Sequence, residues 1–157
     1  MTDNAGPADK ELLEWVERVA MYLAADGVPP VTGRVLGWLM VCDPPEQSAA
    51  EICAAIGASR AALTTSTRTL MTMGFIERRT RPGGRTAYYR VVDGAWEKVV
   101  RRQVAALTAF REVAADGMAL VGPGTARAAR LREARDVFDW MAEVFDQAPP
   151  PAPLGEK

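Results

Sequence analysis

Residues 48–90 decide the fold, and they read SAAEICAAIGASRAALTTSTRTLMTMGFIERRTRPGGRTAYYR. Ser48 and Glu51 have the spacing of a capping box, in which each side chain accepts a hydrogen bond from the other residue's backbone N–H. Gly57 can adopt the left-handed conformation common at helix ends, so we expect this first helix to end there. Ser59 follows two residues later and is predicted to cap a second helix.

The second helix is expected to end at Gly74, and two strands follow at residues 75–80 and 86–91. The sequence Pro82-Gly83-Gly84 between them has the composition of a tight turn, so the strands should form a hairpin. Two short helices joined by a tight turn and followed by a hairpin are a winged helix-turn-helix. The predicted fold class is therefore mainly α, with a small β wing.

Positive charge is concentrated in this stretch. Between residues 59 and 90 one acid, Glu77, stands against seven arginines, which are Arg60, Arg68, Arg78, Arg79, Arg81, Arg85 and Arg90. The segment therefore carries +6, whereas the whole chain carries −1. A basic segment in an acidic chain indicates a surface that binds double-stranded DNA. The alternative is a solvated charged hairpin, because edge strands often carry charge that prevents aggregation.

The second helix shows two faces. The residues predicted to pack inward are Leu63, Thr67 and Leu70, with Met71 and Met73 near the helix end. The opposite face carries Ala61, Thr64, Thr65, Arg68 and Thr72, with Arg60 at the exposed first turn. Small residues allow close entry into a major groove, where threonine and arginine can contact base edges or phosphates. The alternative is an ordinary solvent face rich in threonine.

The hairpin is expected to act as a wing. Arg81 and Arg85 flank its tip, and arginine inserted into a minor groove meets enhanced negative potential. For Arg78, Arg79 and Arg90, near the base, we expect phosphate contacts or simple solvation. Tyr88 and Tyr89 alternate in direction, so one of them is predicted to lie in the core.

Composition excludes several classes of function. The 157 residues are 48% hydrophobic and 25% charged, which is ordinary for one globular domain. We expect a cytoplasmic protein without a membrane span, because residues 1–11 are polar and no apolar run approaches ~20 residues. The chain has no histidine, no glycine-rich phosphate loop and no clustered carboxylate pair, so we expect neither an enzyme nor a metal or other cofactor.

The two cysteines, Cys42 and Cys53, are interpreted as reduced core residues, with a redox-sensing pair as the alternative.

Helices are expected on both sides of the winged motif. Apolar spacing predicts helices over residues 9–26, from a cap at Thr32 to Val41, from Asp93 to about Gly117, and over residues 125–146. In the last one a heptad seam runs through Leu131, Ala134, Phe138, Met141 and Phe145, and Val137, Trp140 and Val144 widen it. This apolar surface exceeds what one neighbour requires, so residues 9–26 and 93–147 are predicted to form a helical dimerisation domain. The alternative is packing within one chain.

Residues 31–91 are expected to form the DNA-binding domain. Residues 1–8 and the Pro-rich tail 148–157 are predicted to be disordered.

The order of these elements resembles that of MarR-type transcriptional regulators. The string GRVLGWLMVCDP at residues 33–44, followed by GFIER at residues 74–78, is similar to the GbsR-like branch and to actinobacterial repressors of lipid-transport and drug-efflux pumps. The similarity covers about residues 10–147. It implies a homodimer that reads a pseudo-palindromic operator in double-stranded DNA, and a repressor controlled by an apolar or amphipathic small-molecule effector.

The resemblance also implies site residues. On the recognition helix these are Ser59, Arg60, Thr64, Thr65 and Arg68, and on the wing Arg85. Relatives often have an acid before the wing arginine and a second arginine after it, whereas this chain has Gly84 and Thr86. For the effector, helix position suggests Tyr22, Arg34, Leu36 and Phe110. The rival interpretation of the whole chain is a winged-helix module that binds a protein partner.

Overall fold

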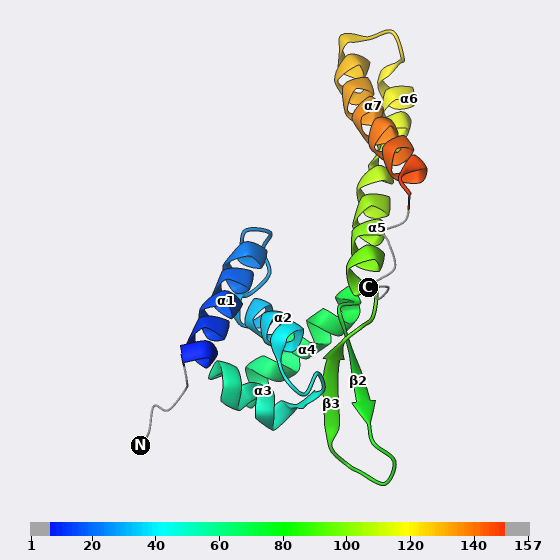
Figure 1. The fold of residues 1–157 in the computed structure, drawn as a ribbon. Coiled ribbons are helices and arrows are strands. Elements are labelled where there is room, and N and C mark those ends of the chain that lie inside the picture. The colour runs from blue at the N-terminus through cyan, green and yellow to red at the C-terminus, as the bar shows by residue number, and fades with distance from the viewer. Residues whose placement is uncertain (1–6, 150–157) are drawn as a thin grey trace. The chain divides into compact units, whose positions relative to one another are not determined.

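The computed structural model describes residues 7–149, and these divide into two compact units, residues 7–95 and 96–149 (Figure 1). The first unit contains α1 (Pro7–Ala24), α2 (Pro30–Val41), β1 (Gln47–Ser48), α3 (Ala49–Ile56), α4 (Arg60–Met73), β2 (Ile76–Thr80) and β3 (Ala87–Val91). The second is built from α5 (Ala95–Thr108), α6 (Phe110–Val121) and α7 (Ala126–Gln147). The predicted disorder of residues 1–6 and 150–157 lies outside the described residues, while α1 begins inside the stretch expected to be disordered.

The predicted helix-turn-helix is confirmed by its caps. The Ser48 backbone N–H donates to Glu51 Oε2 at 2.6 Å, and the Glu51 N–H donates to Ser48 Oγ at 3.3 Å. Hydrogen bonds from the side chain and backbone of Ser48 hold the pKa of Glu51 below its usual range. Gly57 and Gly74 end α3 and α4 with φ of 64° and 88°, values that favour glycine.

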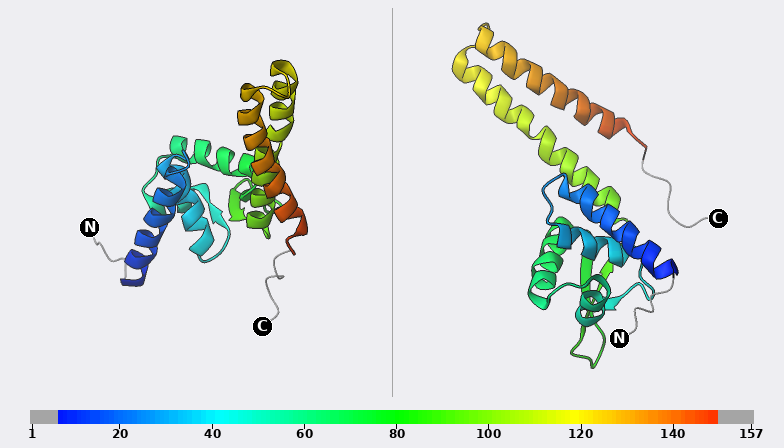
Figure 2. Two further views of the ribbon diagram at one scale, coloured as in Figure 1. Left: turned by 90° about the horizontal axis from the view of Figure 1, so that it is seen from above. Right: turned by 90° about the vertical axis from the view of Figure 1, so that its left-hand side faces the viewer.

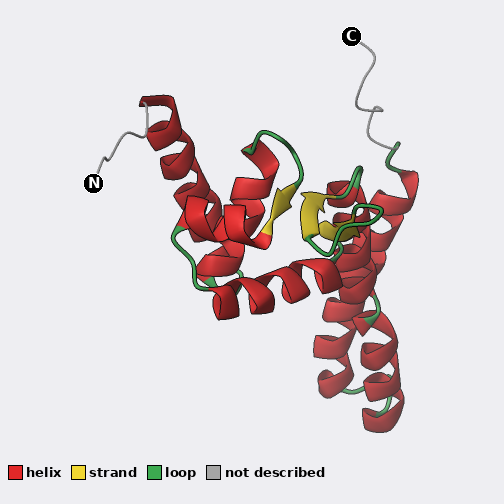
Figure 3. Ribbon diagram, turned by 90° about the horizontal axis from the view of Figure 1, so that it is seen from below, coloured by secondary structure: helices red, strands yellow, loops and turns green. Residues whose placement is uncertain are grey.

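The wing belongs to a three-stranded antiparallel sheet with the order β1-β3-β2 (Figure 3). The hairpin pairs Ile76 with Val91 and Thr80 with Ala87, as the turn predicts. The two-residue strand β1 is too short to show alternation, and the sequence analysis missed it. Because β3 is the central strand of this small sheet, Tyr88 and Tyr89 are both half-buried, and the prediction that one lies in the core is wrong.

Helix α2 forms the core of the first unit, as its apolar sequence predicts. Val35 and Leu36 are completely buried on it. The helix begins at Pro30, because proline at the first helical position sacrifices no hydrogen bond. Thr32 is therefore not the predicted cap. It is 2% exposed and donates a hydrogen bond of 3.0 Å to Ser66 Oγ on α4.

Glycines allow α1 to pack closely on α2 (Figure 2). A Cβ atom at Gly33 would lie 2.6 Å from Ala20 Cα, and one at Gly37 would lie 3.2 Å from Val19 Cβ. The first distance is far below van der Waals contact and involves backbone, so only glycine fits there. Helix α1 therefore contributes to the core of the first unit. Its predicted part in dimerisation stays a prediction.

The second unit is a helical hairpin with an extension. Helices α6 and α7 lie side by side, held by an edge-to-face contact between Phe110 and Phe138 with ring centroids 5.6 Å apart (Figure 2). Thr125 caps α7 by accepting a hydrogen bond from the Ala128 N–H. The single helix predicted from Asp93 to Gly117 is instead two, because the helical hydrogen-bonding pattern is interrupted at Ala109. Across residues 7–149, each helix is too short or too polar to cross a membrane.

The contact at Gly33 makes a first prediction. We expect Gly33→Ala to destabilise the protein by about 1–3 kcal/mol, because the added methyl group forces α1 away from α2. Thermal or urea unfolding measures this change. Gly124→Ala is the control, since a Cβ there meets no atom within 4 Å. Equal stability of the two variants would contradict the close packing.

Candidate nucleic-acid interface

The inner face of α4 is buried as the sequence predicts. Leu63, Thr67 and Leu70 are each at most 2% exposed, and Ser66 is buried beside them. Met71 was predicted to pack inward, but it is 36% exposed, because it lies beyond the row of residues that faces α2. This burial holds α4 by one face and leaves the other face free.

The outer face of α4 carries the predicted contact residues. Ala61, Thr64, Thr65, Arg68 and Thr72 are all exposed, with Arg60 at the first turn. Each of the three threonines donates its hydroxyl proton to a backbone carbonyl four residues earlier, at 2.9–3.3 Å. The oxygens of Thr64 and Thr65 therefore keep lone pairs that can accept from base amino groups, and the threonine methyl groups can contact thymine.

The N-terminus of α4 offers donors to a phosphate. Ser59 Oγ accepts a hydrogen bond of 3.1 Å from the Ala62 N–H, so its own proton remains available. Among the described residues, Arg60 and Arg68 form no ion pair with a carboxylate. Free guanidiniums beside a helix N-terminus are well suited to bind phosphate or guanine.

The wing tip presents two more arginines. A hydrogen bond of 3.0 Å from Gly84 N–H to Arg81 carbonyl closes the turn, and Gly83 adopts φ of 76°. The Arg81 guanidinium lies over the Tyr88 ring, 4.1 Å from its centroid, which orders the side chain while its N–H groups can still donate. Arg85 is exposed and forms no ion pair with any described residue.

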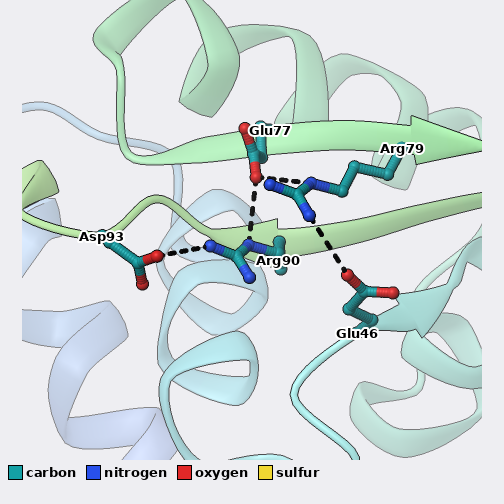
Figure 4. Close-up of polar contacts among 5 residues, drawn as sticks. All are labelled: Glu46, Glu77, Arg79, Arg90 and Asp93. Carbon is teal, nitrogen blue, oxygen red and sulfur yellow. Dashed lines mark hydrogen bonds and ion pairs between the residues drawn. The ribbon is translucent and has the colours of Figure 1, made fainter.

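At the wing base, two arginines form ion pairs with three carboxylates (Figure 4). Glu77 Oε1 lies 2.7 Å from Arg79 Nε and 3.0 Å from Arg90 Nε. Asp93 lies 2.7 Å from Arg90 Nη2, and Glu46 lies 4.0 Å from Arg79 Nη1. Both arginines thus form ion pairs with carboxylates in the structure, and the phosphate contacts expected of them stay a prediction.

Sequence counting overestimated the positive charge for this reason. Three of the four acids in the region, Glu46, Glu51 and Asp93, lie outside the segment counted as +6. Counting residues 46–93 instead gives seven arginines against four acids, or +3. The pairing of Glu77 with Arg90 could have been found by counting strand register outward from the turn. Arg78 is exposed and unpaired among the described residues, so it joins the candidate contacts.

The predicted effector residues are divided between the two units, and their role stays a prediction. Leu36 is completely buried, and Tyr22 is 72% exposed. Arg34 lines a cleft of about 270 Å³ between α1, α2 and α3, where its Nη2 donates to Glu17 Oε2 at 3.1 Å. That hydrogen bond raises the pKa of Arg34. Phe110 belongs to the second unit and packs on Phe138.

The two cysteines are free thiols, and both are half-buried. Burial raises the pKa of Cys42, and nearby Asp43 and Glu51 raise it further. A raised pKa lowers the thiolate fraction at neutral pH, and the thiolate is the form that reacts with oxidants. This environment gives the redox alternative no support at Cys42.

Fold and surface together define a class of protein. A helix held by one face, with threonines and free arginines on the other and a basic hairpin beside it, is a winged helix-turn-helix that binds double-stranded DNA.

Comparison with known proteins identifies the family. A family model described as MmpR5-like MarR family transcriptional regulator matches residues 94–148. The HTH-type transcriptional regulator MmpR5 of Mycobacterium tuberculosis (strain ATCC 25618 / H37Rv) is 34% identical over 142 residues, which cover 90% of this chain and 86% of that protein. A crystal structure of a transcriptional regulator aligns with a TM-score of 0.74 and 34% identity, covering 87% of this chain and 93% of that one.

The chain belongs to the MarR family of transcriptional regulators, and it is a DNA-binding regulator. The resemblance to this family and the mainly α winged-helix fold are thus confirmed. The GbsR-like branch and the individual DNA-contacting residues stay predictions.

The wing allows a test of free against paired arginines. We expect Arg85→Ala to weaken binding to all duplexes and to make the slope of log affinity against log salt shallower by about 0.9, the loss of one phosphate contact. Arg79→Ala, in the same hairpin, should change the slope much less because carboxylates already occupy Arg79. Fluorescence anisotropy across a salt series measures both. Equal losses would show that pairing does not decide which arginines reach DNA.

Proposed function

We propose that this regulator is a homodimeric, ligand-responsive repressor that reads a pseudo-palindromic operator with α4 and the wing. The observation that carries the DNA-contacting part is the free guanidiniums of Arg60, Arg68 and Arg85 beside the exposed threonine face of α4. We assign Ser59, Arg60, Thr64, Thr65 and Arg68 to the major groove and its adjacent phosphates, and Arg81 and Arg85 to the minor groove. As the resemblance implies, the target is an efflux or transport operon.

Dimerisation is supported by apolar side chains that the second unit leaves exposed. On α7, Val137, Trp140 and Val144 are 51%, 63% and 47% exposed and follow one another at helical spacing. Further large exposed apolar residues on α5 and α6 are Trp96, Val100, Leu107, Phe110, Val113 and Leu120. A monomer rarely exposes so many large apolar side chains on one helical unit, whereas a homodimer interface buries them.

A dimer also explains how short recognition helices could select a site. Each α4 contacts only a few base pairs, and two of them spaced about 34 Å apart read successive major grooves on one side of the duplex. A two-fold symmetric protein then requires an operator with matching pseudo-symmetry.

A ligand would control DNA binding by changing the distance between the two α4 helices of the dimer. An apolar cleft of about 320 Å³ in the second unit is lined by Trp96, Val100 and Phe145, with the paired Glu97 and Arg101 at its side. This combination suits an amphipathic small molecule. A ligand that binds more tightly to a dimer with different spacing shifts the population away from the DNA-competent form, by no more than its difference in affinity.

The proposed function is tested by binding of the purified protein to the intergenic DNA upstream of its own gene. We expect two chains per site, protection of a two-fold symmetric sequence, and a steep negative dependence on salt. Amphipathic compounds can then be screened for release of the same DNA. Binding that is weak and equal on every duplex would contradict an operator at that position.

The dimer interface gives a separate prediction. We expect Trp140→Glu to shift the protein to monomers and to weaken operator binding at least tenfold, because an ionised carboxylate would be buried in the interface. Light scattering after gel filtration measures the mass. The control is Arg130→Gln, which changes the net charge equally at an exposed polar position of α7. Dimers of unchanged stability would show that this face of α7 is not the interface.

A further inference from the structure

One face of the wing carries a row of charged side chains from its base toward its tip. Side chains at every second position of a strand share a face, so Glu77 and Arg79 lie together on β2, and Arg81 follows directly after the strand ends. Directly across, β3 places Arg90 opposite Glu77 and Tyr88 opposite Arg79. A single oxygen, Glu77 Oε1, contacts both Arg79 and Arg90, at 2.7 Å and 3.0 Å (Figure 4).

This row is divided into two parts of different charge. At the base, the three carboxylates of Glu46, Glu77 and Asp93 surround two guanidiniums, which leaves a net charge of −1. At the tip, Arg81 lies on Tyr88 and Arg85 is exposed, and neither forms an ion pair within the described part of the chain. The wing can therefore offer its tip to DNA while Arg79 and Arg90 at its base are held by carboxylates.

Stability alone does not account for this arrangement. The side chains of Glu77 and Arg79 are 36% and 53% exposed, and ion pairs exposed to that degree add little to folding. The pairing has a larger effect on DNA binding, since every free arginine near a phosphate adds sequence-independent affinity.

We propose that Glu77 is a specificity-determining residue, which keeps Arg79 and Arg90 from binding phosphates. By competing with the DNA backbone for these two guanidiniums, Glu77 lowers affinity for any duplex without touching the base contacts of α4. The ratio of operator affinity to non-specific affinity is thereby raised. The inference rests on the part of the proposed function in which the wing contacts DNA.

The test is Glu77→Gln, which keeps the side-chain shape and removes the charge. Binding to a random-sequence duplex and to the operator duplex is followed by anisotropy across a salt series. We expect the non-specific salt slope to steepen by about 0.9 for each arginine released, so that a fourfold drop in salt gains an extra factor of about 3.5 per contact. The ratio of operator affinity to non-specific affinity should fall.

Three further variants separate this effect from a simple change in net charge. Glu14→Gln changes the net charge equally at an exposed position of α1, and its slope should match that of the wild type. Adding Arg79→Gln to Glu77→Gln should remove about half of the gain. Arg79→Gln alone should leave the wild-type slope unchanged, and a slope shallower by about 0.9 would show that Arg79 already binds phosphate and would overturn the proposal.

The remaining outcomes distinguish this inference from the proposed function. Equal slopes for Glu77→Gln and Glu14→Gln, with Arg85→Ala still weakening binding, would refute the role of Glu77 alone. If Arg85→Ala also has no effect, the wing does not contact DNA, and both the docking and the role of Glu77 fail.

Discussion

The packing of α4 on α2 is the interaction on which the DNA-reading surface depends. Leu63 and Leu70 are buried in this contact, and the hydrogen bond between Thr32 and Ser66 adds a polar link within it. A buried polar pair of this kind restricts how one helix can rotate on the other, because rotation would leave both hydroxyls without partners. The outer face of α4 is thus fixed in direction before any DNA is present.

Local chemistry made much of the fold predictable. Capping residues and left-handed glycines act within a few positions, so the bounds of α3, α4 and the hairpin could be derived directly from residues 48–90. Features set by distant contacts could not. Strand β1 exists because β3 pairs with it, and Thr32 is buried because Ser66 lies opposite. The helix interruption at Ala109 could not be predicted, because no proline or glycine lies at that position.

The candidate site shows the same division. The faces of α4 follow from helical periodicity, and the structure leaves its predicted contact residues exposed. The charge of the wing was harder to predict, since an arginine counts toward DNA binding only if no carboxylate already holds it. Asp93 lies only three residues after Arg90, but Glu46 reaches Arg79 from outside the hairpin, through tertiary proximity. Counting charges along a segment cannot detect such neutralisation, whereas the register of the strands partly can.

Gly33 changes how the string GRVLGWLM at residues 33–40 should be interpreted. A Cβ at Gly33 would lie too close to the Ala20 backbone for a larger side chain, one at Gly37 would make a tight contact with Val19, and Val35 and Leu36 of the string are buried. The string therefore determines how α1 packs on α2, and it predicts little about which operator or ligand the protein binds. Two regulators that share it are expected to share an architecture while controlling unrelated genes. Whether two such regulators control the same genes is better judged by comparing the outer residues of α4 and the arginines of the wing tip.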